Sequence, residues 1–147
     1  VAEHFKDTFS RLFGGGTAKL VLTEPASLTT TGIDILARLP GRKQQGLALL
    51  SGGERALTAC ALIFAILRVN PPPFAMLDEV DAALDEANVG RFRDLLLELS
   101  QATQFVVITH NRNTLQAADT VYGISMGNDS ASQAISLRLD GETVASS

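Results

Sequence analysis

Hydrophobic positions in the first forty residues change from a helical to an alternating spacing. Apolar side chains recur at helical spacing up to Phe13, and the glycines at 14–16 end that helix. We interpret this stripe as core packing, with the exit of a long coiled coil as the alternative. Residues 18–22 have the pattern of a strand, and the alternation over residues 33–39 predicts a second strand paired with the first. A polar loop is predicted over residues 40–46.

One long helix is predicted in the middle of the chain. Ser51 and Glu54 have the S-x-x-E spacing of a capping box, and an apolar run continues to about Arg68. The three prolines at 71–73 forbid any continuation of this helix. The wholly apolar segment Phe74–Leu77 then predicts a short strand of the kind that is buried on both faces of a parallel sheet.

Helices and strands alternate in the C-terminal half. The pattern predicts a helix from about residue 85 to residue 100, another buried strand over 105–108, and a short helix that ends near Ala118. Residues 121–124 and the alternation at 135–139 predict further strands. The order strand–helix–strand–helix–strand, behind an antiparallel pair, is typical of α/β proteins. We therefore predict one α/β domain with a parallel sheet core, helices and additional antiparallel strands.

Composition fits a globular domain. Of the 147 residues, 46% are apolar and 19% charged, and the net charge of −4 leaves no global basic field for nucleic acid. No apolar run is long enough to span a bilayer and no signal peptide is visible, so we expect a cytoplasmic protein without membrane contact. Cys60, the only cysteine, is expected to pack as a small apolar residue. The chain begins at Val1 within a helical pattern, and we interpret it as a fragment of a longer protein.

The first candidate site is the start of the long helix. Gly52 and Gly53 directly follow Ser51, so the backbone there can approach a ligand without an intervening β-carbon. The helix N-terminus also offers unpaired N–H groups and a positive dipole end, which favour a phosphate. A simple capping box on a surface helix is the alternative, but it does not need two glycines.

The second candidate site follows the strand at 74–77. Asp78 and Glu79 leave its carboxyl end, the edge where open α/β sheets bind ligands, and we assign Mg²⁺ to Asp78 and the attacking water to Glu79. His110 follows the next buried strand and is a candidate γ-phosphate contact, with a structural role as the alternative. Asp81 lies just beyond the acidic pair and could reach across an interface, whereas Asp85 is more typical of a helix cap.

No phosphate-binding loop accompanies these residues. The sequence contains no G-x-x-x-x-G-K-[ST], and Gly14-Gly15-Gly16-Thr17-Ala18-Lys19 precedes a strand rather than a helix. A loop that cradles phosphates would therefore have to lie on another segment.

Several stretches together resemble a known family. Leu50-Ser51-Gly52-Gly53-Glu54-Arg55 resembles the signature motif of ATP-binding-cassette (ABC) ATPases, and Phe74 to Glu79 resembles their Walker B strand. With Phe13-Gly14-Gly15-Gly16, the run from Asp78 to Asp85 and Gln104 to His110, the chain is similar to the C-terminal head lobe of structural maintenance of chromosomes (SMC) proteins. The resemblance runs from about Phe5 to Leu139, with a departure at Gly127-Asn128-Asp129-Ser130.

The resemblance implies a composite ATPase. Residues 1–13 would be a helix at the exit of the coiled coil, and residues 14–147 would form the C-terminal half of an ABC-type P-loop NTPase head. It would join its own N-terminal Walker A lobe. Two heads would then sandwich two ATP molecules with Mg²⁺: Asp78 and Glu79 would serve their own head's ATP, and Ser51, Gly52 and Gly53 the partner's.

The resemblance also implies partners and a role. A kleisin subunit and a second head of the same kind are expected to bind, and DNA is expected to be held through the full complex in chromosome condensation and segregation at the nucleoid. The isolated fragment is expected to lack ATPase activity. The alternatives are a coiled-coil ATPase of double-strand-break repair, a transporter cassette and a non-catalytic assembly module.

Overall fold

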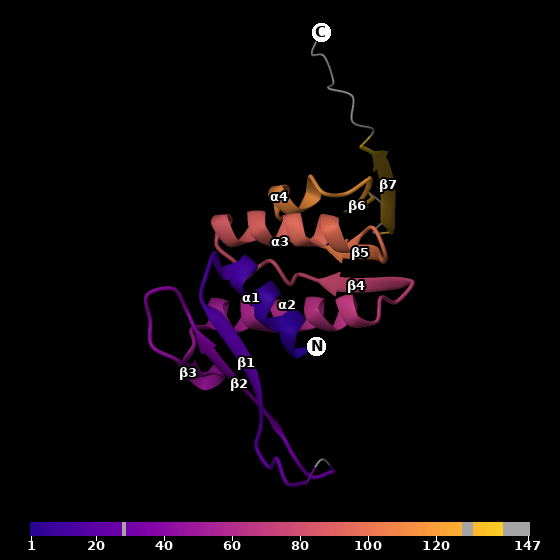
Figure 1. Ribbon diagram of the computed structural model, residues 1–147. Coiled ribbons are helices and arrows are strands. Elements are labelled where there is room, and N and C mark those ends of the chain that lie inside the picture. Colours follow the sequence, from indigo (N-terminus) through magenta and orange to yellow (C-terminus); the bar gives the residue numbers. More distant parts are fainter. Residues whose placement is uncertain (28, 128–130, 140–147) are drawn as a thin grey trace.

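The fold combines four α-helices with three small sheets among residues 1–27, 29–127 and 131–139, which the computed structural model describes (Figure 1). In chain order the elements are α1 (Ala2–Phe13), β1 (Thr17–Leu22), β2 (Ile33–Arg38), β3 (Gln45–Gly46), the 3₁₀ turn η1 (Leu47–Leu49), α2 (Gly52–Val69), β4 (Phe74–Asp78), α3 (Glu86–Leu99), β5 (Gln104–Ile108), α4 (Arg112–Leu115), β6 (Thr120–Met126) and β7 (Ser132–Arg138). None of the described helices is long and apolar enough to cross a membrane.

Helix α1 is part of the core, as its stripe predicts. Phe5, Phe9 and Leu12 are fully buried, and the helix packs against α2, α3 and β1. Gly14 ends it in the left-handed conformation, with φ of 65°. Gly16 also has a positive φ, and a β-carbon there would lie 2.4 Å from the carbonyl oxygen of Arg38, so this turn requires glycine.

The predicted antiparallel pair is confirmed. Strands β1 and β2 pair antiparallel, with Ala18 opposite Ala37 and both side chains buried in the core. The loop after β2 is polar, as expected, but its last two residues add β3 to the edge of β2. This sheet carries α1 on one side and leads directly into η1 and the start of α2.

The parallel pair is confirmed, but its burial is not. Strands β4 and β5 run parallel with Leu77 opposite Val107, and this inner face joins the core beneath α2 and α3. On the outer face Phe74 is 60% exposed and Met76 66% exposed, and Val106 and Ile108 are also exposed. The prediction of strands buried on both faces is therefore wrong for the described part of the chain, because its helices cover only one face of this sheet.

The last predicted strands form a separate hairpin. Strands β6 and β7 pair antiparallel, and among the described residues β6 does not join β5, so the parallel sheet has two strands rather than three. Helix α4 ends at Leu115, and turns continue the chain to Ala118. In the loop between β6 and β7, residues 128–130, where the sequence departs from the resemblance, lie outside the described residues.

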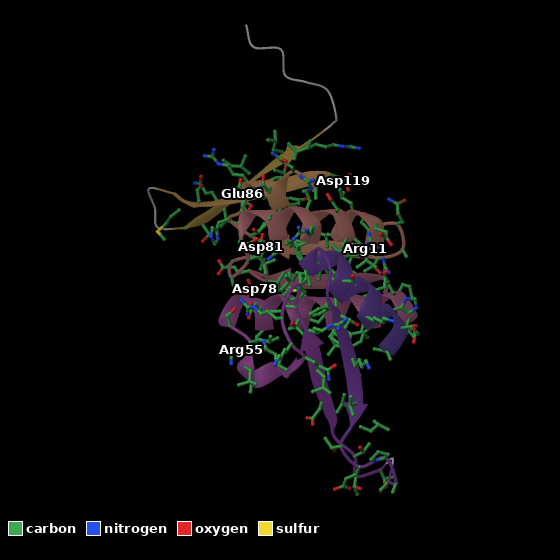
Figure 2. All side chains as sticks on the ribbon, turned by 60° about the vertical axis from the view of Figure 1, so that its left-hand side comes forward. Arg11, Arg55, Asp78, Asp81, Glu86 and Asp119 are labelled. Carbon is green, nitrogen blue, oxygen red and sulfur yellow. The ribbon has the colours of Figure 1, made fainter. Side chains whose placement is uncertain are left out.

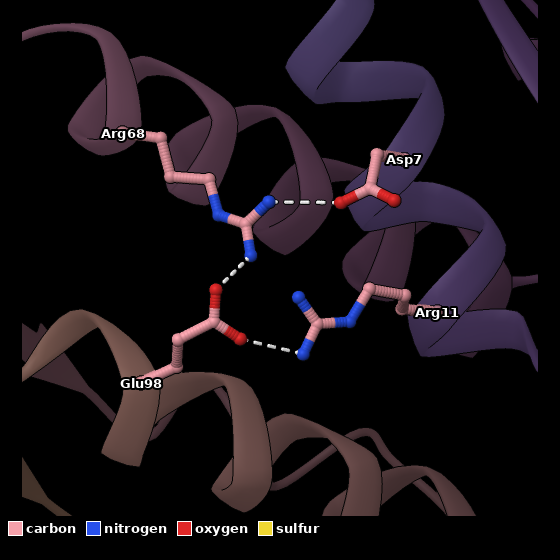
Figure 3. Close-up of polar contacts among 4 residues, drawn as sticks. All are labelled: Asp7, Arg11, Arg68 and Glu98. Carbon is pink, nitrogen blue, oxygen red and sulfur yellow. Dashed lines mark hydrogen bonds and ion pairs between the residues drawn. The ribbon is translucent and has the colours of Figure 1, made fainter.

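Four charged side chains join the three core helices on the surface (Figure 3). Glu98 of α3 accepts from Arg11 of α1 at 2.7 Å and from Arg68 of α2. Arg68 also donates to Asp7 of α1 at 2.8 Å. This network crosses between helices that are far apart in sequence, and it fixes the end of α2 opposite the signature stretch against α1 and α3.

Candidate functional site

The signature stretch forms a complete capping box. Ser51 is the N-cap of α2: its hydroxyl accepts from the amide of Glu54 at 3.3 Å, and its own amide donates to the Glu54 carboxylate at 2.8 Å. Arg42, in the loop after β2, donates to the same carboxylate at 3.1 Å. The pKa of Glu54 is lowered, first by the Ser51 amide and further by Arg42. The predicted helix start is confirmed, and it holds the Ser51 backbone in a fixed position.

The two glycines after Ser51 have different surroundings. A β-carbon on Gly52 would meet open space, whereas one on Gly53 would lie 2.8 Å from the carbonyl oxygen of Ala83. No described residue accepts a hydrogen bond from the amide of either glycine, as is normal in the first turn of a helix. The start of α2 therefore presents free N–H groups on its open side and packs tightly against the loop after β4 on the other.

The acidic pair lies at the carboxyl end of β4. Asp78 is the last residue of the strand and is exposed, and Glu79 begins the turn that follows. Glu79 has φ of 45°, the one positive φ found for a non-glycine residue in the described chain. Such backbone conformations are costly and gather at functional sites. In the view of Figure 2, Asp78 lies between Arg55 of α2 and Asp81.

Glu79 and His110 come together at one edge of the parallel sheet. The amide of Glu79 donates to the carbonyl of Ile108 at 2.9 Å, which continues the pairing of β4 and β5 beyond the strands. The Nδ1 atom of His110 lies 3.9 Å from Oε1 of Glu79. Both side chains face solvent, with 76% of His110 and 61% of Glu79 exposed. The predicted clustering of Glu79 with His110 is confirmed, and the cluster is open on its outer side.

Asp81 is placed differently from the prediction. Its side chain is 1% exposed, and Oδ2 accepts from the hydroxyls of Thr109, at 2.6 Å, and Thr114. The expectation that Asp81 reaches across an interface is therefore wrong for this conformation, because the carboxylate points into its own chain. Asp85 is the N-cap of α3, as predicted: its side chain accepts from the amide of Asn88 at 2.8 Å.

The carboxylates suit a metal ion that is shared with a substrate. Among the described residues there is no group of three His, Cys, Asp or Glu side chains that could enclose a metal. Mg²⁺ usually takes one or two carboxylates and completes its shell with water and phosphate oxygens. The exposed Asp78 fits that pattern, and it would hold Mg²⁺ together with ligands from outside this chain.

Three residues that no sequence motif singled out also support the site. Arg42 supports the capping box, and Thr109 and Thr114 hold Asp81. Thr109 precedes His110, which is a weak signal. Thr114 lies 33 residues from Asp81, and Arg42 lies 12 residues from Glu54. No local pattern links either pair.

Comparison with known proteins decides the family. A sequence model described as the RecF/RecN/SMC N terminal domain matches residues 23–133, most of the chain. The chain belongs to the RecF/RecN/SMC family. The chromosome partition protein Smc of Bacillus subtilis is 54% identical over 140 residues, which are 95% of this chain but 12% of that protein. The chain thus spans about an eighth of the curated relatives it matches.

Solved SMC structures share the fold. The Smc head domain from Pyrococcus furiosus, bound to the C-terminal domain of ScpA, has a TM-score of 0.88 and 41% identity over 94% of this chain and 34% of that chain. A structure from work on ATP-driven dimerization and DNA-stimulated activation of SMC ATPases has a TM-score of 0.85 and 40% identity, covering 94% of this chain and 83% of that one. The chain is therefore part of the ATPase head of a bacterial-type SMC chromosome partition protein, with the mixed α/β fold of those heads.

Proposed function

We propose that this chain is the C-terminal lobe of the SMC head. Residues 1–13 would be the helix at the coiled-coil exit, and residues 14–147 the lobe with the signature, Walker B, D-loop and switch histidine. The presence of a signature and an acidic pair without any G-x-x-x-x-G-K-[ST] supports this assignment. On joining the N-terminal Walker A lobe, the chain would hydrolyse ATP.

The exposed face of the parallel sheet supports a missing second lobe. Phe74, Met76, Val106 and Ile108 form an apolar surface on β4 and β5. Parallel strands are normally covered on both faces. The N-terminal lobe of the same protein is the proposed cover.

The Glu79–His110 cluster carries the proposed chemistry. Glu79 would orient the attacking water and take up its proton, and His110, 3.9 Å away, would contact the γ-phosphate. Asp78 would hold Mg²⁺, which when bound neutralises phosphate charge. The free amides of Gly52 and Gly53, with Ser51, would bind the ATP of a second head, because a helix N-terminus favours phosphate.

The proposed partners follow from the same assignment. A second copy of the head would complete each ATP site, and a kleisin would bind as ScpA does in the Pyrococcus furiosus structure. DNA would be held by the full complex rather than by this acidic lobe, in the cytoplasm and at the nucleoid. ATP hydrolysis would then drive chromosome condensation and segregation.

Adding the other lobe tests the proposal. The 147-residue chain alone should show no phosphate release with ATP and Mg²⁺, and activity should return when an N-terminal SMC lobe is supplied. A Walker A lysine variant of that added lobe is the matched control and should restore nothing. If the reconstituted head stays inactive while the lobes bind each other, the chain is a non-catalytic assembly module and the proposed function is wrong.

A further inference from the structure

Two loops of the candidate site are joined by a buried carboxylate. The turn after β4, residues 79–85, carries Glu79, and the turn after β5, residues 109–111, carries His110. Asp81 belongs to the first turn, and its Oδ2 accepts from Thr109 of the second at 2.6 Å and from Thr114 in α4. Its Oδ1 is buried and has no hydrogen-bond partner among the described residues, so both contacts rest on one oxygen.

The hydroxyl of Thr109 both donates and accepts a hydrogen bond. Its single proton goes to Asp81, and its oxygen accepts from the amide of Asn111 at 2.9 Å. Asn111 in turn is the N-cap of α4, and its side chain accepts from Asn113 at 2.9 Å. The residues on both sides of His110 are therefore anchored, while the His110 side chain itself remains exposed.

We infer that Asp81 is a positioning residue that holds His110 in register with Glu79. Two hydroxyl groups from the second turn and from α4 converge on one buried oxygen of Asp81, so this link is suited to fixing the distance between the two loops. The backbone bond joins Glu79, the first residue of the turn after β4, to Ile108, the last residue of β5, and the Asp81–Thr109 bond ties the two turns together beyond it. The catalytic consequence of this register rests on the proposed function, whereas the register itself does not.

The first experiment measures the register in the 147-residue chain without nucleotide. The chain has two histidines, so the ring resonances of His110 can be followed by NMR with His4 as the internal reference. Glu79→Gln should shift the His110 ring resonances and leave those of His4 unchanged. In a Thr109→Val background, which keeps the β-branched shape but lacks the hydroxyl, this shift should fall at least about threefold, because coupling between side chains requires their contact. Thr109→Ser keeps the hydroxyl and should restore it.

The inference would be overturned if Glu79→Gln still shifted the His110 resonances fully in the Thr109→Val background. It would also be overturned if the shift fell as much in the Thr109→Ser background as in the Thr109→Val background. Thr109→Ala provides the same test should the valine variant not fold, since position 109 is only half-buried. In the reconstituted head, Thr109→Val should lower kcat by about 10-fold to 100-fold, the scale of small misplacements, with KM for ATP within about twofold. An unchanged kcat beside a lost NMR coupling would contradict the proposed role of His110 while supporting the register.

Discussion

Gly53 lies so close to the loop after β4 that a β-carbon at this position would stand 2.8 Å from the carbonyl oxygen of Ala83. The signature helix and the loop that carries Glu79 are thus in direct backbone contact within one chain. Under the proposed function these two segments serve different ATP molecules.

Alanine substitutions at the two signature glycines should have opposite effects on stability. Gly53→Ala should destabilise the fold by about 1–3 kcal/mol, the usual cost of forcing an extra group into packed structure. Gly52→Ala is the matched control, because its β-carbon would meet open space and alanine is the better helix former. Urea unfolding of both variants checks this, and equal stability of the two would show that the contact with Ala83 yields easily.

Local sequence signals account for most element boundaries. The S-x-x-E spacing at Ser51 predicted a capping box, and the capping box is present; the glycines after Phe13 and the prolines before Phe74 placed the ends of α1 and α2 within a residue or two. These signals work because caps and breakers act through neighbouring backbone groups. The clustering of Glu79 and His110 was also predictable, since parallel neighbours end at the same edge of a sheet.

Features that depend on distant partners were not predictable. Asp81 has the same sequence context as an exposed loop residue, and only the folding of Thr109 and Thr114 around it buries the carboxylate. The exposure of Phe74 and Met76 was not predicted. The apolar residues of a strand indicate that its faces favour burial, but they do not show whether the same chain supplies the residues that bury them. Likewise, no pattern linked Arg11 to Glu98, 87 residues later.

Removal of the Glu98 charge should weaken the link between the three core helices. Glu98→Gln loses its charged contacts with Arg11 and Arg68, and we expect a loss of about 1 kcal/mol in the free energy of unfolding, because Glu98 is half exposed although Arg68 is largely buried. Asp94→Asn is the control, since its pair with neighbouring Arg93 is exposed and local. Chemical denaturation measures the free energy of unfolding of both variants. Equal losses would mean that the Glu98 network contributes no more stability than an exposed local ion pair.

The effect of Glu98→Gln should also depend on pH and salt. The hydrogen bond from Arg11 lowers the pKa of Glu98 in the folded state, and Arg68 adds to this. The stabilisation is therefore fully present above the unfolded pKa of about 4.3 and is lost as pH falls through the lower folded pKa. The difference between Glu98→Gln and the parent should be constant from pH 7 to 6, shrink below about pH 4, and decrease in 1 M salt.

Cys60 should resist alkylation in the folded chain. Burial raises the pKa of its thiol to about 11, with a smaller contribution from the charge of Asp81. Because the thiolate is the reactive form, iodoacetamide at pH 8 should modify native Cys60 at least about 100-fold more slowly than the urea-unfolded chain. Mass spectrometry of timed samples gives both rates. Equal rates would contradict the buried position of this thiol.

Ser51→Arg should separate nucleotide binding from head engagement. The Ser51–Gly53 stretch is proposed to bind the ATP of a second head, so a bulky cation there should block dimerisation and hydrolysis. A single head reconstituted from both lobes should still bind ATP, because its own phosphate loop is intact. Ser51→Thr keeps an N-cap hydroxyl and is the control for damage to the helix start. Loss of ATP binding by one Ser51→Arg head would refute the assignment in trans.

The two adjacent carboxylates should give distinct defects. Glu79→Gln keeps the size of the side chain but removes the charge that is proposed to orient the attacking water. Loss of a general base costs about 10²–10⁴ in rate, or roughly 3–5 kcal/mol of barrier. In the reconstituted head, ATP should still bind to Glu79→Gln, and engaged dimers should accumulate because hydrolysis no longer releases them. Light scattering with ATP and Mg²⁺ measures the engaged dimers, and phosphate release measures the rate of hydrolysis.

Asp78→Asn is the matched comparison for this last prediction, since it changes the neighbouring exposed carboxylate by the same isosteric step. Its defect should be in Mg²⁺-dependent ATP binding, so few engaged dimers should form, and raising the Mg²⁺ concentration should partly recover them. Glu79→Gln should be insensitive to added Mg²⁺, because its carboxylate is not proposed to hold the ion. Near-normal hydrolysis by Glu79→Gln would show that Glu79 is not the base, and identical behaviour of the two variants would remove the distinction between base and metal ligand at this edge of the sheet.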